Sequence, residues 1–156
     1  MAIHIVLVEP EIPPNTGNIA RTCAATGSVL HLVEPLGFSV DDKSLKRAGL
    51  DYWPYVKVEM HKSLDDFLDQ YKDRRLYLAT TKGRHLYTEV AYRDEDMILF
   101  GKETAGLPKK LIEERQDDTV RIPMSKDTRL RSFNLSNSAG IVLFEALRQL
   151  DFPDLR

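Results

Sequence analysis

Short apolar runs that alternate with helical segments constrain the fold of this chain most strongly. Each run has the length of one buried strand and is bounded by turn-forming residues such as Gly, Pro, Asn and Asp. Six runs predict strands: residues 3–8, 29–33, 56–60, 75–80, 97–100 and 119–122. Strands that alternate with helices predict an α/β fold, with a mostly parallel sheet and helices on both faces.

The segments between these runs predict five helices. Their expected positions are residues 18–26, 41–49, a stretch that begins after Ser63, 108–115, and a long C-terminal helix. Asn15 or Thr16 is expected to cap the first helix, and one of the polar residues at 136–138 the last, because short polar side chains bond to free amides there. Glu145, Arg148 and Gln149 are expected on the polar side of the last helix, opposite its broad apolar surface.

Composition limits the class of protein. The 156 residues fit one domain, and the single cysteine excludes a disulfide framework. A net charge of −2 argues against a protein dominated by non-specific nucleic-acid binding, although two basic clusters occur. No apolar stretch is long enough to span a membrane, and the N-terminus carries no basic leader, so a cytoplasmic protein is expected.

The loops that follow the strands are the expected ligand site. In parallel sheets ligands bind beyond the carboxyl ends of the strands, and here those loops are rich in Gly, Pro, Asn, Ser and charge. The first loop, residues 9–18, has a single glycine and two adjacent prolines. It therefore lacks both the dinucleotide-binding fingerprint and the phosphate-binding P-loop, which argues against the common NAD and NTP sites.

Few side chains suggest a reaction by themselves. Arg21, one turn into the first helix, either reaches an anion or lies on a solvated face. Glu103, between two glycines, either accepts hydrogen bonds from a ligand or belongs to an ordinary loop. The four histidines are scattered without metal-ligand spacing, and Cys23 is expected to be a small core residue. No hydrolase motif is present, so these patterns leave the reaction open.

Three segments together resemble the SPOUT (SpoU–TrmD) superfamily of RNA methyltransferases. They are residues 15–27, 98–108 and 121–149, and their order and spacing also match. The stretch 34–53 is similar to the minimal, single-domain TrmL type, which methylates the ribose 2′-hydroxyl of the wobble nucleotide of tRNA. The resemblance covers essentially the whole chain, so it implies one methyltransferase domain over residues 1–156.

The resemblance implies a site and an assembly. Family members tie a deep trefoil knot near the C-terminus, bind S-adenosylmethionine in it, and form a homodimer through the first and last helices. The implied cofactor-binding residues are Ala79, Thr80, Gly101, Glu103, Gly106, Ile122, Met124, Ser132 and Leu135. The implied catalytic residues are Arg21, Arg131 and Asn134, with Arg21 expected to anchor a phosphate and to stabilise negative charge on the ribose oxygen.

The implied substrate is the anticodon loop of a leucine tRNA, with cytidine or a modified uridine at position 34. Lys43, Lys46, Arg47, Lys126 and Arg129 are the candidates for phosphate contact. Tyr52 and Trp53 are expected either to pack in the core or to stack on a base. Phe133 stands where the family has Leu or Met, and the stretch before it is longer by a residue or two. Two alternatives stay open: methylation of another RNA, and a knotted dimer that binds RNA or cofactor without catalysis.

Overall fold

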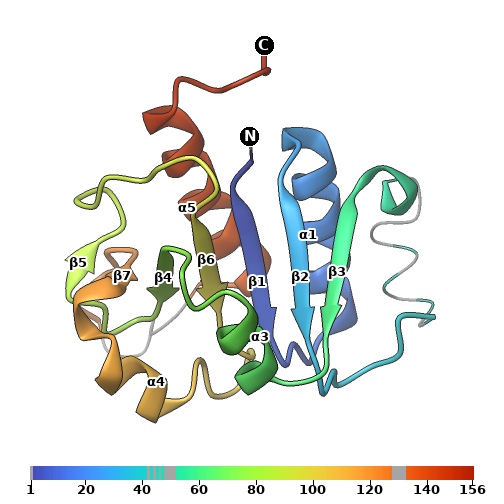
Figure 1. Ribbon diagram of the computed structural model, residues 1–156, viewed down its shortest axis with the longest axis horizontal. Helices are drawn as coiled ribbons and strands as arrows, with labels where there is room; N and C mark the ends of the chain where they lie inside the picture. The colour runs from blue at the N-terminus through green and yellow to red at the C-terminus, as the bar shows by residue number, and fades with distance from the viewer. Residues whose placement is uncertain (1, 42, 44, 46, 48–51, 128–132) are drawn as a thin grey trace.

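The computed structural model describes residues 2–41, 43, 45, 47, 52–127 and 133–156. These residues form a seven-stranded sheet in the order β3-β2-β1-β6-β4-β7-β5 (Figure 1), and its six strand pairings are all parallel. The strands are β1 (His4–Val8), β2 (Val29–Val33), β3 (Lys57–His61), β4 (Leu76–Ala79), β5 (His85–Leu86), β6 (Met97–Phe100) and β7 (Thr119–Arg121). The predicted parallel sheet is confirmed, and every predicted strand is present within two residues. The two-residue strand β5 was too short to predict.

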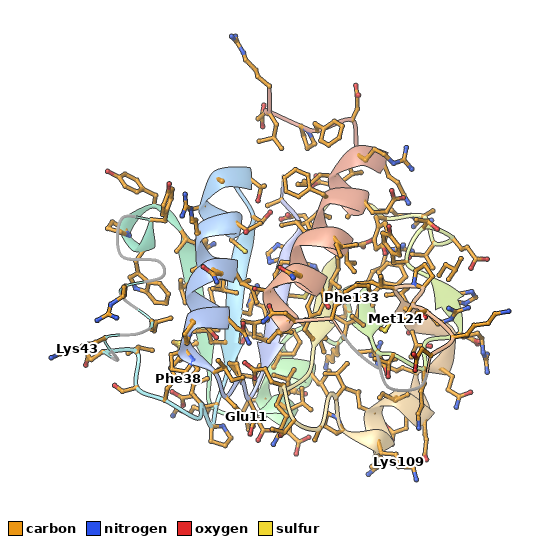
Figure 2. The ribbon with its side chains drawn as sticks, turned by 180° about the vertical axis from the view of Figure 1, so that it is seen from behind. Glu11, Phe38, Lys43, Lys109, Met124 and Phe133 are labelled. Carbon is orange, nitrogen blue, oxygen red and sulfur yellow. The ribbon has the colours of Figure 1, made fainter. Side chains whose placement is uncertain are left out.

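Helices cover both faces of the sheet. They are α1 (Pro13–Thr26), α3 (Leu64–Gln70), α4 (Lys109–Glu114) and α5 (Leu135–Gln149), with short 3₁₀ turns at Trp53–Tyr55 and Gln116–Asp118. Helices α1 and α5 lie side by side on one face, and α3 and α4 lie on the other (Figures 1 and 2). The predicted helix at 41–49 falls largely on residues outside the described ranges. Within those ranges, no helix is both long and apolar enough to cross a membrane.

Two apolar cores, one on each side of the sheet, explain why the strands read as continuous apolar runs. Along β1, Ile5 and Leu7 join the core under α1 and α5, whereas Val6 and Val8 join the core under α3 and α4. All five residues of β1 are buried. A strand covered on both faces needs apolar side chains at every position, which is the pattern of a parallel sheet.

The start of α1 differs from the prediction. The helix begins at Pro13, and Asn15 and Thr16 are buried inside its first turn, so the expected cap at either position is wrong. Two prolines suit this place because their fixed φ is helical and because the amide that proline lacks would have no partner within the helix. Ile12 occupies the cap position and offers no side-chain hydrogen bond to the helix.

The polar side of α5 also differs from the prediction. Glu145 is only 9% exposed, and its carboxylate accepts hydrogen bonds from Arg148 at 2.8 and 3.1 Å and from Gln149 at 2.7 Å. Gln149 in turn donates to the carbonyl of Val90 at 3.0 Å and accepts from the amide of Tyr92 at 2.9 Å. Gln149, held by Glu145, therefore ties the end of α5 to the loop before β6, whereas Arg148 is on the exposed side of the helix as expected.

Candidate functional site

A cavity of about 1020 Å³ opens at the carboxyl ends of β4, β6 and β7. Its walls come from the three loops that leave these strands and from the start of α5. Every expected cofactor residue that the structure describes lines it: Ala79, Thr80, Gly101, Glu103, Gly106, Ile122, Met124 and Leu135, together with Asn134. Met124 and Phe133, both labelled in Figure 2, mark the side of the cavity next to α5. Arg131 and Ser132 lie outside the described residues.

The loop after β6 owes its shape to two glycines. A Cβ on Gly101 would lie 2.0 Å from the carbonyl carbon of Gly106, so no other residue fits without moving the backbone. Gly106 has φ +71°, and its amide donates to the carbonyl of Lys102 at 2.8 Å. The loop therefore folds back on itself, with a backbone geometry that requires glycine at both positions.

Glu103 joins this loop to the start of α1. Its Oε1 accepts from the amide of Glu11 at 2.8 Å, and its Oε2 accepts from the amide of Ile12 at 3.0 Å and from Asn15 Nδ2 at 3.2 Å. The carboxylate thus holds the two backbone amides that lead into α1 and the side chain of Asn15 in the first turn of the helix. Its expected contact with the cofactor stays a prediction, and the structure adds this bridging role.

A second set of hydrogen bonds joins the loops after β1 and β6, and here the acceptor is in the β1 loop and the donors are in the β6 loop. The carboxylate of Glu11 accepts from the hydroxyl of Thr104 at 2.7 Å and from its amide at 3.0 Å. These hydrogen bonds favour the charged form and lower the pKa of Glu11. Figure 2 shows Glu11 at the edge of the molecule, near the first turn of α1. The two acidic residues therefore form a reciprocal clamp between the β1 and β6 loops.

Asn134 is the N-cap of α5, which corrects the expectation that residues 136–138 supply the cap. The helix begins at Leu135, and Asn134 Oδ1 accepts from the amides of Ser136 at 2.9 Å and Asn137 at 3.4 Å. Asn134 Nδ2 donates to Asn15 Oδ1 at 3.1 Å. Because Asn15 also donates to Glu103, one continuous chain of hydrogen bonds joins the β6 loop, α1 and α5 beside the cavity.

Arg21 does not reach the cavity of its own chain. It is exposed on α1, and its guanidinium carbon lies 4.7 Å from the ring centre of Tyr52, a cation–π distance. Trp53 packs against the main core, which favours the core alternative for that residue. Cys23 is fully buried, and burial raises its thiol pKa to about 12, so it is an inert core residue as predicted.

The predicted phosphate contacts are placed only in part. Lys43, Arg47 and Lys126 are exposed, and Lys43 lies at the outer edge of the molecule in Figure 2. Lys46 and Arg129 are outside the described residues. Exposure leaves these three cations accessible to an anionic partner, and their contact with RNA stays a prediction.

A parallel sheet with a cavity at the carboxyl ends of its strands defines an α/β protein that binds a small ligand at this edge. The family model described as "SpoU rRNA Methylase family" matches residues 2–144. The chain therefore belongs to the SpoU methylase family, as its resemblance to the wider superfamily implied.

Relatives and solved structures agree with this assignment. A Bacillus subtilis protein, provisionally named a tRNA (cytidine(34)-2′-O)-methyltransferase, is 52% identical over 100% of this chain and 98% of its own. The tRNA (cytidine(34)-2′-O)-methyltransferase of Escherichia coli K12 is 49% identical over 97% of this chain and 96% of its own. A structure concerned with the 2-OH methylation of C/U34 on tRNA has a TM-score of 0.90 and 43% identity, covering 96% of this chain and 97% of its own. An rRNA methyltransferase of Sinorhizobium meliloti, solved with bound AdoMet, has a TM-score of 0.84 and 26% identity, covering 96% of this chain and 57% of its own.

The cap at Asn134 predicts a graded response to substitution. Asn134→Ala removes the acceptor for two amides and should lower the free energy of unfolding by about 1 kcal/mol. Asn134→Ser keeps a hydroxyl acceptor for the cap and, like Ala, loses the bond to Asn15, so it should recover at least half of that loss. Urea denaturation at one fixed protein concentration measures both values. A Ser variant that is as unstable as the Ala variant would contradict the cap role.

Proposed function

We propose that this protein transfers a methyl group from S-adenosylmethionine to the ribose 2′-hydroxyl of the wobble nucleotide of tRNA. The target is cytidine or a modified uridine at position 34, and the tRNA is a leucine tRNA. The observation that carries the proposal is the cavity, because it gathers every described residue that the resemblance implies for cofactor binding. Relatives of 49% and 52% identity, matched over nearly their whole lengths, bear the name of this reaction.

The cavity suits this cofactor in size and in chemistry. Its volume is at the upper end of the range for small-ligand pockets. Ala79, Ile122 and Leu135 offer aliphatic surface for an adenine ring, and the peptide groups of the glycine loop offer donors and acceptors. When bound, S-adenosylmethionine supplies an electrophilic methyl group on a sulfonium, whose positive charge disappears as the methyl leaves, so a poorly hydrated cavity favours transfer.

The protein's own residues must orient a weak nucleophile. In the proposal Asn134, fixed by its bonds to α5 and Asn15, orients the reacting region together with Ser132, and Arg131 acts as a second catalytic arginine. Arg21 anchors the phosphate next to the target nucleotide and stabilises the negative charge that develops on the ribose oxygen. A guanidinium stays protonated, so the hydroxyl proton passes to a phosphate or to water and not to arginine.

A homodimer through α1 and α5 completes the proposal. Phe144 on α5 is 47% exposed and Ile12 at the start of α1 is 42% exposed, although both belong to elements that pack closely with the rest of the fold. Arg21 lies outside the cavity of its own chain, on the exposed part of α1. An interface formed by α1 and α5 would cover the apolar side chains and would direct Arg21 toward the partner subunit's cavity.

The remaining proposed features concern topology and location. We propose the superfamily's trefoil knot for the segment between β7 and α5, part of which lies outside the described residues. The strand order supports it, since β4 lies between β6 and β7 and the chain then returns to α5 beside α1. We also propose a cytoplasmic location, because the proposed substrate is tRNA.

If the proposal is correct, labelled methyl groups will be incorporated only at the ribose 2′-oxygen of position 34. Labelled S-adenosylmethionine and leucine tRNA should give a single product, the 2′-O-methylated nucleotide at position 34, identified by nuclease digestion and mass spectrometry. A tRNA with 2′-deoxycytidine at position 34 is the matched control, because it keeps the base and lacks the acceptor oxygen. Methylation of a base, of another RNA only, or of nothing would overturn the proposal.

Arg21 should separate catalysis from cofactor binding. Arg21→Ala should leave the Kd for S-adenosylmethionine within about twofold and lower kcat about 100-fold or more, because a charge that acts in the transition state is removed. Arg21→Lys keeps the charge but not the planar fork, so its kcat should be intermediate. Calorimetry and single-turnover methylation give the two readouts. A lost cofactor affinity in Arg21→Ala would refute the assigned role.

A further inference from the structure

Three buried histidines form a diagonal row across β1, β2 and β3. His4 Nδ1 lies 2.8 Å from His31 Nε2, and His31 Nδ1 lies 2.9 Å from His61 Nε2. The histidines are scattered along the sequence, but the fold brings these three together in the buried interior. Neighbouring parallel strands bring together residues about 30 positions apart, which no local spacing reveals.

A carboxylate lies next to the row at the edge of the sheet. Glu59 on β3 pairs in register with His31 on β2, so their side chains lie on the same face. Glu59 Oε2 is 3.5 Å from His31 Nδ1 and accepts a hydrogen bond from the hydroxyl of Tyr71 at 2.8 Å. The ligand atoms of His31, Glu59 and His61 all lie within 4.8 Å of one another.

The hydrogen bonds behind this group fix which nitrogen of His31 is free. The carboxylate of Glu95 lies 3.3 Å from His4 Nε2, and because an ionised carboxylate only accepts, that nitrogen carries the hydrogen. His4 Nδ1 then accepts from His31 Nε2–H, which leaves the lone pair of His31 Nδ1 directed toward Glu59 and His61.

We propose that His31, Glu59 and His61 bind a divalent transition-metal ion of the zinc class. Two imidazole nitrogens and one carboxylate oxygen are a common protein ligand set for zinc. His4 and Glu95 supply the outer contacts that hold a ligating histidine in its tautomer and orientation. Tyr71 does the same for the carboxylate of Glu59.

Binding requires a small adjustment of the side chains. Two nitrogens that share a tetrahedral zinc with bonds of about 2.0–2.1 Å are separated by about 3.3 Å, so the 2.9 Å contact of His31 and His61 must open slightly. In the metal-free state a hydrogen on His61 Nε2 completes the bond to His31. The ion would take the place of this hydrogen, which moves to the other nitrogen of His61. Glu59, with 31% of its side chain exposed, gives the site access to solvent.

The proposed metal site would stabilise the sheet and take no part in methyl transfer. It lies on the α3 face, where the rings of Phe67 and Tyr71 pack against His31 and His61. Strands β1 and β2 separate β3 from β6, where the methylation cavity begins. A bound ion would therefore fasten the edge strand β3 to β2 and raise the stability of the fold.

Metal binding by untagged, metal-free protein tests the proposal. Titration with Co²⁺ should give one ion per chain, with the visible absorption of four-coordinate cobalt, and Zn²⁺ should displace it. Zn²⁺ at about 100 times its Kd should raise the Tm by about 5 °C or more. His61→Gln should abolish binding, and Glu59→Gln, at a partly exposed position that can keep the bond from Tyr71, should weaken it at least about tenfold.

His85→Gln is the matched control, because His85 lies in β5 at the opposite edge of the sheet. Its metal affinity should equal that of the unsubstituted protein, and the unliganded Tm of each variant reports whether it is folded. Absence of one-to-one binding by the unsubstituted protein would overturn the proposal. The proposal would also be overturned if His61→Gln and Glu59→Gln bound the metal as tightly as the unsubstituted protein, because the ion would then be bound elsewhere. These readouts do not depend on methyl transfer, so they fail or succeed independently of the proposed function.

Discussion

The side chain of Asn15 holds the candidate site together. It donates to Glu103 in the loop after β6 and accepts from Asn134 at the start of α5, while its own backbone belongs to the first turn of α1. Asn15 is 5% exposed, so these bonds are sheltered from water and replace hydration that the amide has lost. Three segments that are far apart in sequence thereby have fixed positions around one cavity.

This linkage explains why two acidic and two amide side chains cluster beside a cavity that is expected to hold a ligand with a positively charged sulfonium. Glu103 and Asn134 each line the cavity and also have a structural role, since Glu103 binds the amides that lead into α1 and Asn134 caps α5. The glycine loop supplies a wall that no larger residue at position 101 could form. Arg21 is excluded from this arrangement within one chain, which is why the proposed catalytic arrangement depends on a second subunit.

The central strands of the sheet are predictable because β1, β2 and β6 are buried along their whole length, while the edge strand β3 is more exposed and shows instead an alternating pattern. The sequence also predicted which loops form the cavity, since carboxyl-end loops and motif resemblance pointed to the same residues. The predicted starts of α1 and α5 are wrong, because Pro13, expected in a loop, is the first residue of α1, and the cap of α5 is Asn134 and not a residue at 136–138. The row of His4, His31 and His61 depends on strand neighbours and registers, which no local pattern contains.

Amide hydrogen exchange with and without S-adenosylmethionine tests the central claim most directly, which is that the cavity between β4, β6 and β7 is the cofactor site. The account predicts slower exchange on binding in the loops at residues 79–83, 101–107 and 122–124 and in the first turn of α5, with β2 and β3 unchanged. Protection confined to β2 and β3, or no protection at a saturating concentration, would contradict it.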